Sequence, residues 1–398
     1  MKKIIAFLLV FTVAFSFVAC GKKGEDKTTT KKDTSTTTKA STTSEKTENN
    51  NEEIPDSMST QDGKYEIAFI ADAGQLLDKS FNQGTWEGVK KYADENKKSY
   101  KYYQPANANQ ATDLDRYNAI KSAVQAGAKL IVCAGYLQGE ALKRAAVEFP
   151  EVKFVFVDGI VLTDGEGESG NALTNVAAVA YNEEQAGYLA GFAAVMQGYT
   201  RLGFTGGGGG NNPSCNRYAY GYAQGIEQAA EKLGKDVELT LSWEYGASFS
   251  SSAELQTMLG GWYAKGTEVI FCCGGSMCQS AFAAASANDG AVIGCDVDQS
   301  AESDTVITSA TKELSQSVEF MLDKHYKDKW DEIGAKLTTL GVKENAVGLP
   351  TDTWSMDKFT VEDYNKLFTA MKDGEINVDR DYEKLKQESF RRVTLVIV

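Results

Sequence analysis

The chain has 398 residues, a formal net charge of −14 and 24% charged residues. This acidic balance argues against nucleic-acid binding, which needs a basic face. Seven Cys and a single His, with no CxxC pair, argue against a zinc site, and no cofactor or metal is expected. Beyond residue 20 no apolar run is long enough to cross a bilayer.

The N-terminus predicts export. Two lysines precede an apolar run, Ile4–Ala19, which is too short to span a bilayer comfortably and is typical of a secretory signal. It ends in Phe17-Val18-Ala19-Cys20-Gly21, which resembles the lipobox of bacterial lipoproteins, although Phe17 stands where Leu is usual. We predict a signal peptide over residues 1–20, lipidation of Cys20, and an extracytoplasmic protein anchored to the outer face of the cell membrane. The alternative is an ordinary signal peptide with an incidental Cys.

Residues 21–61 differ in composition from the rest of the chain. They are rich in Lys, Thr, Ser, Glu and Asn and contain no aromatic residue. Such a segment buries too little apolar surface to offset its chain entropy, so we predict a disordered tether. The remaining residues exceed what one hydrophobic core usually covers, and two domains are expected.

Apolar, β-rich runs alternate with amphipathic stretches through the body. Predicted strands are Tyr65–Ile70, Leu130–Ala134, Phe154–Val157, Val176–Ala180, Leu202–Thr205, Val237–Leu241, Val269–Cys273, Val292–Cys295 and Val306–Thr308. Predicted helices lie near 81–92, 114–124, 186–193, 221–233, 253–263, 280–287 and 314–326. Continuous apolar strands suit parallel sheets, and their alternation with helices predicts two doubly wound α/β lobes. Ligands bind such sheets outside the carboxyl ends of the strands.

Polar, aromatic and glycine residues follow several predicted strands. They include Asp72, Ser80-Phe81-Asn82-Gln83, Asp158, Gly206–Gly210, Gly274-Gly275 and Asp296-Val297-Asp298-Gln299. This mixture indicates a polar ligand with flat and hydroxylated parts.

Two aromatic residues are candidates to hold a flat group. Phe81 opens a predicted helix, and Phe249 lies in the loop Ser248-Phe249-Ser250. Together they could sandwich a base, because aromatic stacking contributes roughly 1–3 kcal/mol per base. The alternative is structural: Ser80 is an N-cap with Phe81 as a staple, and Phe249 packs under its own turn.

Other motifs remain open or are disfavoured. Acids at Asp296 and Asp298 invite a calcium-loop interpretation, but Ala301 and Ile307 stand where Gly and Glu are required. Gly206–Gly210 is no P-loop, since no Gly-Lys-Ser/Thr follows; it is a close-approach loop or a surface turn. His325 fits a helix surface, and no catalytic motif is visible. Cys215 and Cys278 lie in loop-like sequence, and their pairing is left open.

The ordered motifs resemble those of the basic membrane protein family, which includes the bacterial purine nucleoside receptor lipoproteins. The resemblance covers nearly all of the body. It rests on Asp78-Lys79-Ser80-Phe81-Asn82-Gln83 with Trp86-Glu87-Gly88, Glu184-Gln185-Ala186-Gly187-Tyr188-Leu189-Ala190-Gly191, Val292-Ile293-Gly294-Cys295-Asp296-Val297-Asp298-Gln299, Thr308-Ser309-Ala310-Thr311-Lys312 and Phe359-Thr360-Val361-Glu362-Asp363-Tyr364.

The resemblance implies a type I periplasmic-binding-protein fold whose two lobes are joined by hinge crossovers. It implies a first lobe over residues 62–182 and 309–340 and a second over 183–308 and 341–398. It also implies that Phe81 and Phe249 sandwich a base, that Asn82 binds the base edge, and that Asp296, Lys312 and Gly275 hold a ribose. Ser80, Asp72 and Asp158 complete the implied site. Glu140 stands where many members have Asp, and the Gly206–Asn212 loop also departs from the family pattern.

We therefore predict a lipid-anchored solute-binding protein, not an enzyme, that captures a nucleoside, by preference a purine nucleoside. Its partners would be the permease and ATPase of an ABC importer, with no nucleic acid. One alternative is a sugar or autoinducer receptor on the same fold. Another is a secreted nucleoside hydrolase, and a third is a sensor for a membrane kinase.

Overall fold

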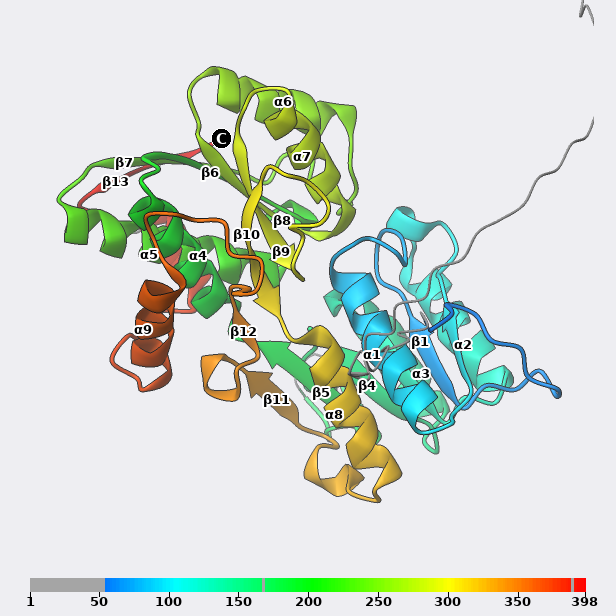
Figure 1. Ribbon diagram of the computed structural model, residues 1–398. Coiled ribbons are helices and arrows are strands. Elements are labelled where there is room, and N and C mark those ends of the chain that lie inside the picture. The colour runs from blue at the N-terminus through cyan, green and yellow to red at the C-terminus, as the bar shows by residue number, and fades with distance from the viewer. Residues whose placement is uncertain (1–53, 167–168, 388–389) are drawn as a thin grey trace, which may run out of the picture. The chain divides into compact units, whose positions relative to one another are not determined.

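The computed structural model describes residues 54–166, 169–387 and 390–398. The predicted signal peptide, Cys20 and most of the predicted tether lie outside these residues. The described residues form two largely parallel β-sheets with helices packed on them (Figure 1). We call the first sheet with its helices lobe 1 and the second with its helices lobe 2, and the two doubly wound lobes agree with the predicted fold class.

Lobe 1 contains a six-stranded sheet with the order β11-β5-β4-β3-β1-β2. Its strands are β1 (Ile67–Ile70), β2 (Tyr100–Tyr103), β3 (Leu130–Ala134), β4 (Lys153–Val157), β5 (Val176–Tyr181) and β11 (Leu337–Leu340). Its helices are α1 (Phe81–Glu95), α2 (Asp113–Gln125), α3 (Gly139–Glu148) and α8 (Leu314–Tyr326). Figure 1 shows α8 lying against α1 although the two are far apart in sequence.

Lobe 2 contains a seven-stranded sheet with the order β12-β10-β9-β8-β6-β7-β13. Its strands are β6 (Arg201–Gly206), β7 (Val237–Ser242), β8 (Val269–Cys273), β9 (Ala291–Asp296), β10 (Val306–Lys312), β12 (Val347–Gly348) and β13 (Val393–Ile397). Its helices are α4 (Glu183–Gln197), α5 (Pro213–Leu233), α6 (Ala253–Ala264), α7 (Cys278–Ser286) and α9 (Val361–Lys372). All pairs are parallel except β10 with β12.

Both faces of each sheet are buried. In β1, Ile67 and Phe69 pack into one hydrophobic core, while Ala68 and Ile70 pack into another on the opposite face. Side chains alternate between faces along a strand, so a sheet covered on both faces needs apolar residues at every position. This is why the central strands are continuous apolar runs.

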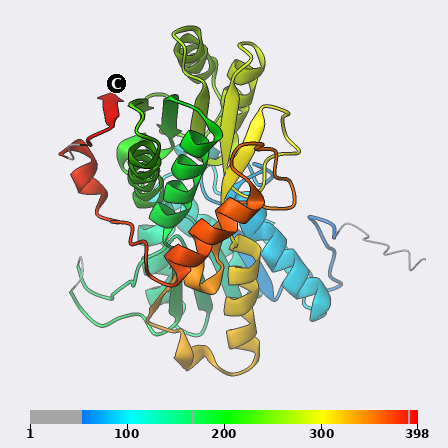
Figure 2. The ribbon, with the colours of Figure 1, turned by 60° about the vertical axis from the view of Figure 1, so that its left-hand side comes forward.

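Helices α4 and α5 form the closest helix pair of lobe 2, which Figure 2 shows side by side. Glycines make the approach possible. A Cβ atom on Gly221 would lie 2.0 Å from the backbone oxygen of Glu184, and one on Gly187 would lie 2.3 Å from that of Tyr218. The pair fixes the N-terminal ends of both helices, which carry Glu183 and Ser214 to the site described below.

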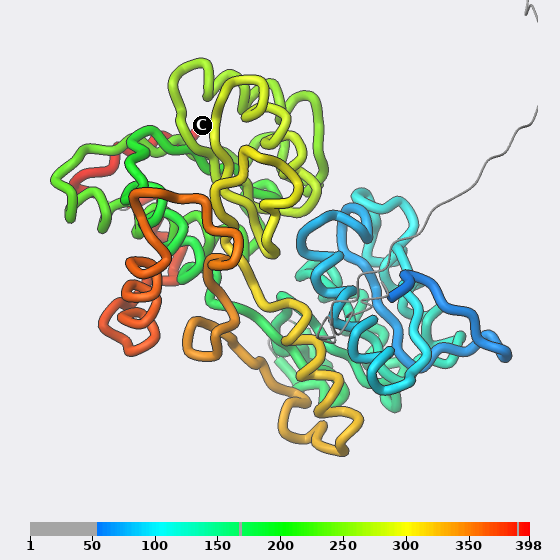
Figure 3. The backbone as a smooth tube through the Cα atoms, viewed as in Figure 1, coloured from blue at the N-terminus to red at the C-terminus, as the bar shows by residue number. Residues whose placement is uncertain are grey.

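The chain passes between the sheets three times, after β5, after β10 and after β11, as can be followed in Figure 3. The predicted boundary at 308/309 falls inside β10, which stays paired with β9 as far as Thr311. The other two crossings, 182/183 and 340/341, coincide with strand ends, and the assignment of each residue to a lobe stays a prediction.

The end of the predicted tether packs on lobe 1. Asp56 accepts hydrogen bonds from Trp86 Nε1 at 2.9 Å and from Lys90 Nζ at 2.8 Å, and Tyr100 donates to the carbonyl of Pro55 at 2.8 Å. Burial alone would lower the pKa of Lys90, but the hydrogen bonds to Asp56 and Glu87 raise it. The body therefore begins at or before residue 54, earlier than composition suggests.

Candidate functional site

A cavity lies where the carboxyl ends of strands from both lobes meet. Its volume is about 40 Å³, less than the roughly 300–1,000 Å³ of a typical small-molecule site. Eight of the ten predicted ligand-binding residues line it, namely Asp72, Phe81, Asn82, Asp158, Phe249, Gly275, Asp296 and Lys312. Ser80 lies directly behind Asp296. Glu140 is not brought to the cavity: it is exposed in the first turn of α3, and Tyr136 from the preceding loop lines the wall instead.

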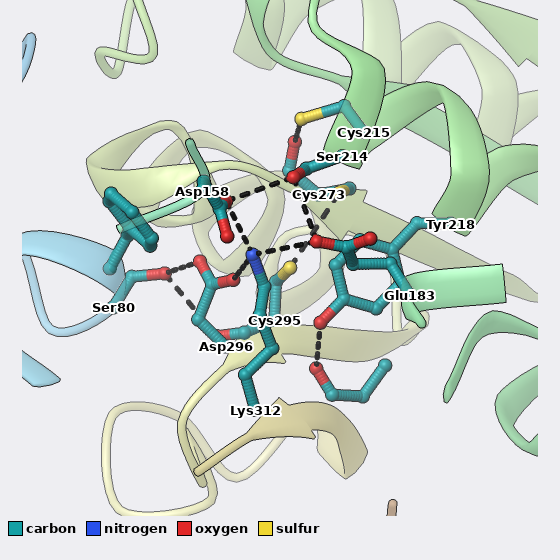
Figure 4. A network of polar contacts seen from close by, with 12 residues as sticks. Ser80, Asp158, Glu183, Ser214, Cys215, Tyr218, Cys273, Cys295, Asp296 and Lys312 are labelled. Atoms are coloured by element: carbon teal, nitrogen blue, oxygen red, sulfur yellow. Dashed lines mark hydrogen bonds and ion pairs between the residues drawn. The ribbon is translucent and has the colours of Figure 1, made fainter. Parts of the chain in front are cut away.

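The Lys312 ammonium lies at the centre of a buried group of carboxylates, shown in Figure 4. Its Nζ is 2.7 Å from Asp158, 3.5 Å from Glu183 and 3.6 Å from Asp296. Burial alone would lower the pKa of Lys312, but these carboxylates raise it well above its ordinary value. The lysine therefore stays charged and joins the end of β4 in lobe 1 to the end of β9 in lobe 2.

Glu183, fully buried at the start of α4, is held in this network from both sides. Arg217 Nε contacts it at 2.6 Å, and Ser214 Oγ lies 2.8 Å from Glu183 and 2.9 Å from Asp158. Although burial raises the pKa of Glu183, the charges of Arg217 and Lys312 hold it below its ordinary value. Two cations thus face three carboxylates, which makes the network electrostatically nearly balanced.

Two of these carboxylates follow their strands in an unusual backbone conformation. Asp158 has φ 52° and Asp296 has φ 69°. Left-handed φ values are uncommon outside glycine, although Asp tolerates them, and such residues cluster at functional sites. The conformation ends each strand sharply and turns the carboxylate toward the cavity.

The packing of Phe249 explains why the loop Gly206–Gly210 consists of glycines. Phe249 has φ 57°, and a Cβ atom on Gly207 would lie 2.2 Å from its ring. A Cβ on Gly206 would likewise meet Trp243 at 2.2 Å. Gly206–Gly210 is therefore the close-approach loop of the two alternatives left open, because its bare backbone gives room for an aromatic that lines the cavity. On the other wall, the Phe81 ring has the Lys312 ammonium 5.1 Å from its centroid.

The start of α1 does not support the structural alternative, in which Ser80 is a helix cap. Its side chain does not cap the helix. Instead Asp78 accepts from the backbone N–H groups of Ser80, Asn82 and Gln83 at 2.9, 3.0 and 3.1 Å. The fully buried Ser80 hydroxyl donates across the lobes to Asp296 at 2.6 Å.

Asn82 has little hydrogen-bonding capacity left. Its Nδ2 donates to the carbonyl of Ala73 at 3.0 Å and to Asp78 at 3.3 Å, and its Oδ1 accepts from the backbone N–H of Asp72 at 2.8 Å. Both amide protons are engaged, so Asn82 can offer a ligand only an acceptor lone pair. Its main effect is to hold the loop 71–78 in shape.

Sequence reasoning missed Glu183, Ser214 and Arg217 as parts of the site. The sequence carries no local signal for Ser214 and Arg217, which reach the network only because α4 and α5 pack closely. The available signal for Glu183 was a pair of adjacent Glu residues at a helix start. The same pair is explained equally well by the stabilising effect of negative charge at a helix N-terminus.

The described cysteines are all buried and free, including Cys215 and Cys278, the pair left open above. Cys273 and Cys295, on adjacent strands, have sulfurs 3.6 Å apart in the cavity wall. Within residues 54–166, 169–387 and 390–398, no His, Cys, Asp or Glu side chains are grouped so that they could hold a metal ion. The place among Asp158, Glu183 and Asp296 is taken by Lys312.

Two doubly wound lobes that enclose a polar and aromatic cavity at their strand ends define a solute-binding protein of the type I periplasmic fold. A solved structure shares the fold: a solute-binding protein of an ABC transporter system from Aeropyrum pernix K1 superposes with a TM-score of 0.62 at 20% identity, over 81% of this chain and 89% of that one. The sequence profile of the family described as "ABC transporter substrate-binding protein PnrA-like" matches residues 64–381, and the chain belongs to this family.

Two curated relatives agree with this family assignment. The ABC transporter nucleoside-binding protein BmpA of Lactococcus lactis subsp. cremoris is 29% identical over 310 residues, which are 72% of this chain and 82% of the relative. Basic membrane protein B of Borreliella burgdorferi is 30% identical over 298 residues, 72% of this chain and 81% of the relative. The predicted resemblance to the basic membrane protein family is confirmed.

The family assigns the chain to a class of binding proteins and not to the enzymes, as predicted. Substrate-binding proteins of ABC importers work outside the cytoplasmic membrane, so the location is extracytoplasmic and the partners are the other transporter components. In the part of the chain that the structure describes, no helix has the length and apolarity needed to cross a membrane.

Proposed function

We propose that this protein captures a nucleoside by closure of its two lobes and passes it to the permease and ATPase of an ABC importer. The observation that carries the proposal is the composition of the cavity wall. Aromatic rings come from both lobes, Phe81 from α1 and Phe249 from the loop after β7, and a lysine with carboxylates lies beside them. The nucleoside-binding name of one relative supports the same solute class.

The proposed roles follow from the free capacity of each group. Phe81 and Phe249 would stack on the two faces of the base, because apolar rings favour a flat π-system. Asp296 would accept from ribose hydroxyls, since its Oδ1 contacts only the Lys312 ammonium, at 3.6 Å. Gly275, with φ 47°, lets the ligand approach the backbone closely.

Lobe closure is supported by polar contacts that bridge the lobes beside the cavity. Ser80 donates to Asp296, and Gln299 Nε2 donates to the carbonyl of Lys79 at 2.9 Å. Contacts of this kind form only when the lobes meet, so they would be broken each time solute enters or leaves. Hinge closure around a ligand is an established mode of response in two-lobed binding proteins.

The lipid anchor at Cys20 and the tether to residue 53 belong to the proposal and lie outside the described residues. The contacts of Asp56 with Trp86 and Lys90 support an anchor attached through lobe 1. A covalently held lobe 1 would leave lobe 2 free to move. Globomycin treatment of cells, followed by detection of the uncleaved chain, would test the processing step.

A thermal-shift screen of the purified full chain tests the solute class. The ligands are adenosine, guanosine, inosine, cytidine, uridine, free hypoxanthine, ribose and glucose, each with and without EDTA. A ligand at a hundred times its Kd adds about 2.7 kcal/mol of stability. We expect nucleosides alone to raise the midpoint, with no effect of EDTA. A shift by sugars only would replace the nucleoside by a sugar, and release of free base would indicate a hydrolase.

Phe249→Ala tests the stacking role. Loss of one stacked face should weaken nucleoside binding roughly 5- to 150-fold, which corresponds to about 1–3 kcal/mol. Phe320→Ala is the matched control, because Phe320 is 43% exposed on α8, away from the cavity. Equal affinities of the two variants would contradict the proposed sandwich.

A further inference from the structure

The loop between β1 and α1 carries two buried carboxyl groups, Asp72 and Asp78, in the cavity wall. Their surroundings differ. Asp78 accepts three backbone N–H bonds at the start of α1 and one from the Asn82 amide. These donors favour the anion, but burial outweighs them and raises the pKa of Asp78 to about 6.

Asp72 lacks such support. Asp72 lines the cavity and is 8% exposed, and its Oδ1 is buried without any hydrogen-bond partner in the protein. The backbone N–H of Ala73 is its one donor. Burial raises the pKa of Asp72 to about 7, with Asp158 and Asp78 acting in the same direction.

The charged and titratable groups that face Asp72 come from several elements. They are Asp78 from its own loop, Arg116 from α2, Tyr136 from the loop after β3, and Asp158 from the end of β4. Arg116 is directed elsewhere: it donates to the carbonyl of Ala111 at 2.7 Å and lies 3.9 Å from Asp113. An ionised Asp72 would therefore be a partnerless anion among other carboxylates, which is costly in a buried site.

We propose that Asp72 enters the closed cavity as a neutral carboxylic acid and donates its Oδ1 proton to an unprotonated ring nitrogen of the solute, so that capture takes up one proton. The proposal rests on the proposed nucleoside function and deepens it. It requires an aromatic heterocycle with an acceptor on its edge. Asn82 beside it cannot serve this acceptor, since both of its amide protons are engaged.

The sign of the pH effect follows from linkage. In a ligand-free form that water enters, Asp72 titrates near its ordinary pKa of about 4. In the closed structure burial raises the pKa of Asp72 to about 7, and the proposal assigns the same raised pKa to the closed complex. Binding is then strongest below pH 4 and weakens as pH rises between these two values, by at most about tenfold per pH unit. Above the higher value it levels off.

The experiment is calorimetry of adenosine binding to the full chain between pH 5 and pH 8. We expect the affinity to fall at least tenfold from pH 5.5 to pH 7.5. At pH 5.5, buffers with different ionisation enthalpies should report uptake of about one proton. Adenosine offers the ring acceptors N1, N3 and N7. The 1-deaza, 3-deaza and 7-deaza analogues each lack one of them, so the analogue with a flat pH profile identifies the acceptor.

Asp72→Asn keeps a donor and an acceptor at this position but does not titrate. We expect it to bind adenosine within about tenfold of the wild type at pH 5.5 and with no pH dependence. Glu184→Gln is the matched control, because burial raises the pKa of Glu184 to about 7 in a place that does not line the cavity. This control should keep the pH dependence.

Three outcomes overturn the inference. They are an affinity that rises with pH, a pH profile unchanged in Asp72→Asn, or flat binding in the wild type. Each leaves the nucleoside function intact, because adenosine still binds. If no nucleoside binds at any pH, the proposed function itself is wrong.

Discussion

The two ends of the cavity differ in how completely their polar groups are paired. At the Lys312 end, Lys312, Arg217, Ser214 and Ser80 contact Asp158, Glu183 and Asp296, and one oxygen, Asp158 Oδ1, is left without a partner. At the Asp72 end, Asp72 Oδ1 lacks a partner, as does Oε1 of Gln138, which does not line the cavity but donates to the carbonyl of Ala71 beside Asp72. Buried polar groups are ordinarily satisfied, so a group of orphan atoms indicates where a ligand supplies the missing bonds. In the proposed function the paired end holds the two lobes together, and the Asp72 end binds the base of the solute.

The largest expected effect comes from a substitution at the Lys312 end of the cavity, where the buried charges are paired. Lys312→Met removes the ammonium from three buried carboxylates and should lower the free energy of unfolding by about 3–5 kcal/mol. Urea denaturation measures it. Lys366→Met is the control, because Lys366 pairs with Glu362 on the surface with 68% of its side chain exposed. Similar losses in the two variants would show that the network is not a buried, balanced one.

The second effect concerns stability. A buried carboxyl group that has an unpaired oxygen and lies away from the cavity should lower the free energy of unfolding when it ionises. Glu184 is 3% exposed in α4, its Oε2 has no partner, and burial raises its pKa from 4.5 to about 7. The stability associated with its neutral form is present below pH 4.5 and is lost as pH rises through about 7. Glu184→Gln should therefore be more stable than the wild type at pH 8, by up to about 3 kcal/mol, and equal to it at pH 4.5. Urea denaturation at both pH values checks this, and a gain that is independent of pH would contradict it.

The third effect distinguishes a contribution to lobe closure, seen in nucleoside affinity, from a contribution to folding, seen in the unfolding midpoint. Ser80→Ala removes the hydroxyl that reaches Asp296 across the lobes and leaves a buried carboxylate oxygen unpaired, at a cost of about 1–2 kcal/mol. Because the contact exists only in the closed form, we expect about 5- to 30-fold weaker nucleoside binding with an unchanged unfolding midpoint of the ligand-free chain. Ser122→Ala, at an exposed position of α2, is the control. A lower midpoint without loss of affinity would assign Ser80 to folding instead of closure.

The smallest effect concerns an exposed ion pair between the lobes, outside the cavity lining. Lys79 Nζ lies 3.8 Å from Glu302, with 48% and 27% of the two side chains exposed. Surface pairs contribute about 0–1 kcal/mol and are screened by salt. Lys79→Ala should weaken binding less than about fivefold, and the difference should vanish at high salt. Lys97→Ala, which loses a pair with Asp94 at the C-terminal end of α1, should have no effect on binding.

The sequence determined the class of fold. Central strands such as Leu130–Ala134 and Val269–Cys273 were predicted at their observed bounds, because strands buried on both faces must be apolar throughout. Strands β2, β11, β12 and β13 were missed. They are short or lie at sheet edges, where one side lacks a partner and polar residues such as Lys101 and Thr338 are tolerated.

Only the tertiary structure decided which candidate residues contact one another and which of them line the cavity. In the sequence Ser80 was also a candidate helix cap, yet Asp78 takes that role. A carboxylate three residues before the first helical residue reaches the free N–H groups and leaves the hydroxyl to face the other lobe. Glu140 matched a family position but points away from the cavity. Glu183, Ser214 and Arg217 entered the site through the glycine-lined packing of α4 on α5. Local sequence determines which residues end a strand or open a helix, whereas pairing among buried charges depends on distances between segments far apart in the chain.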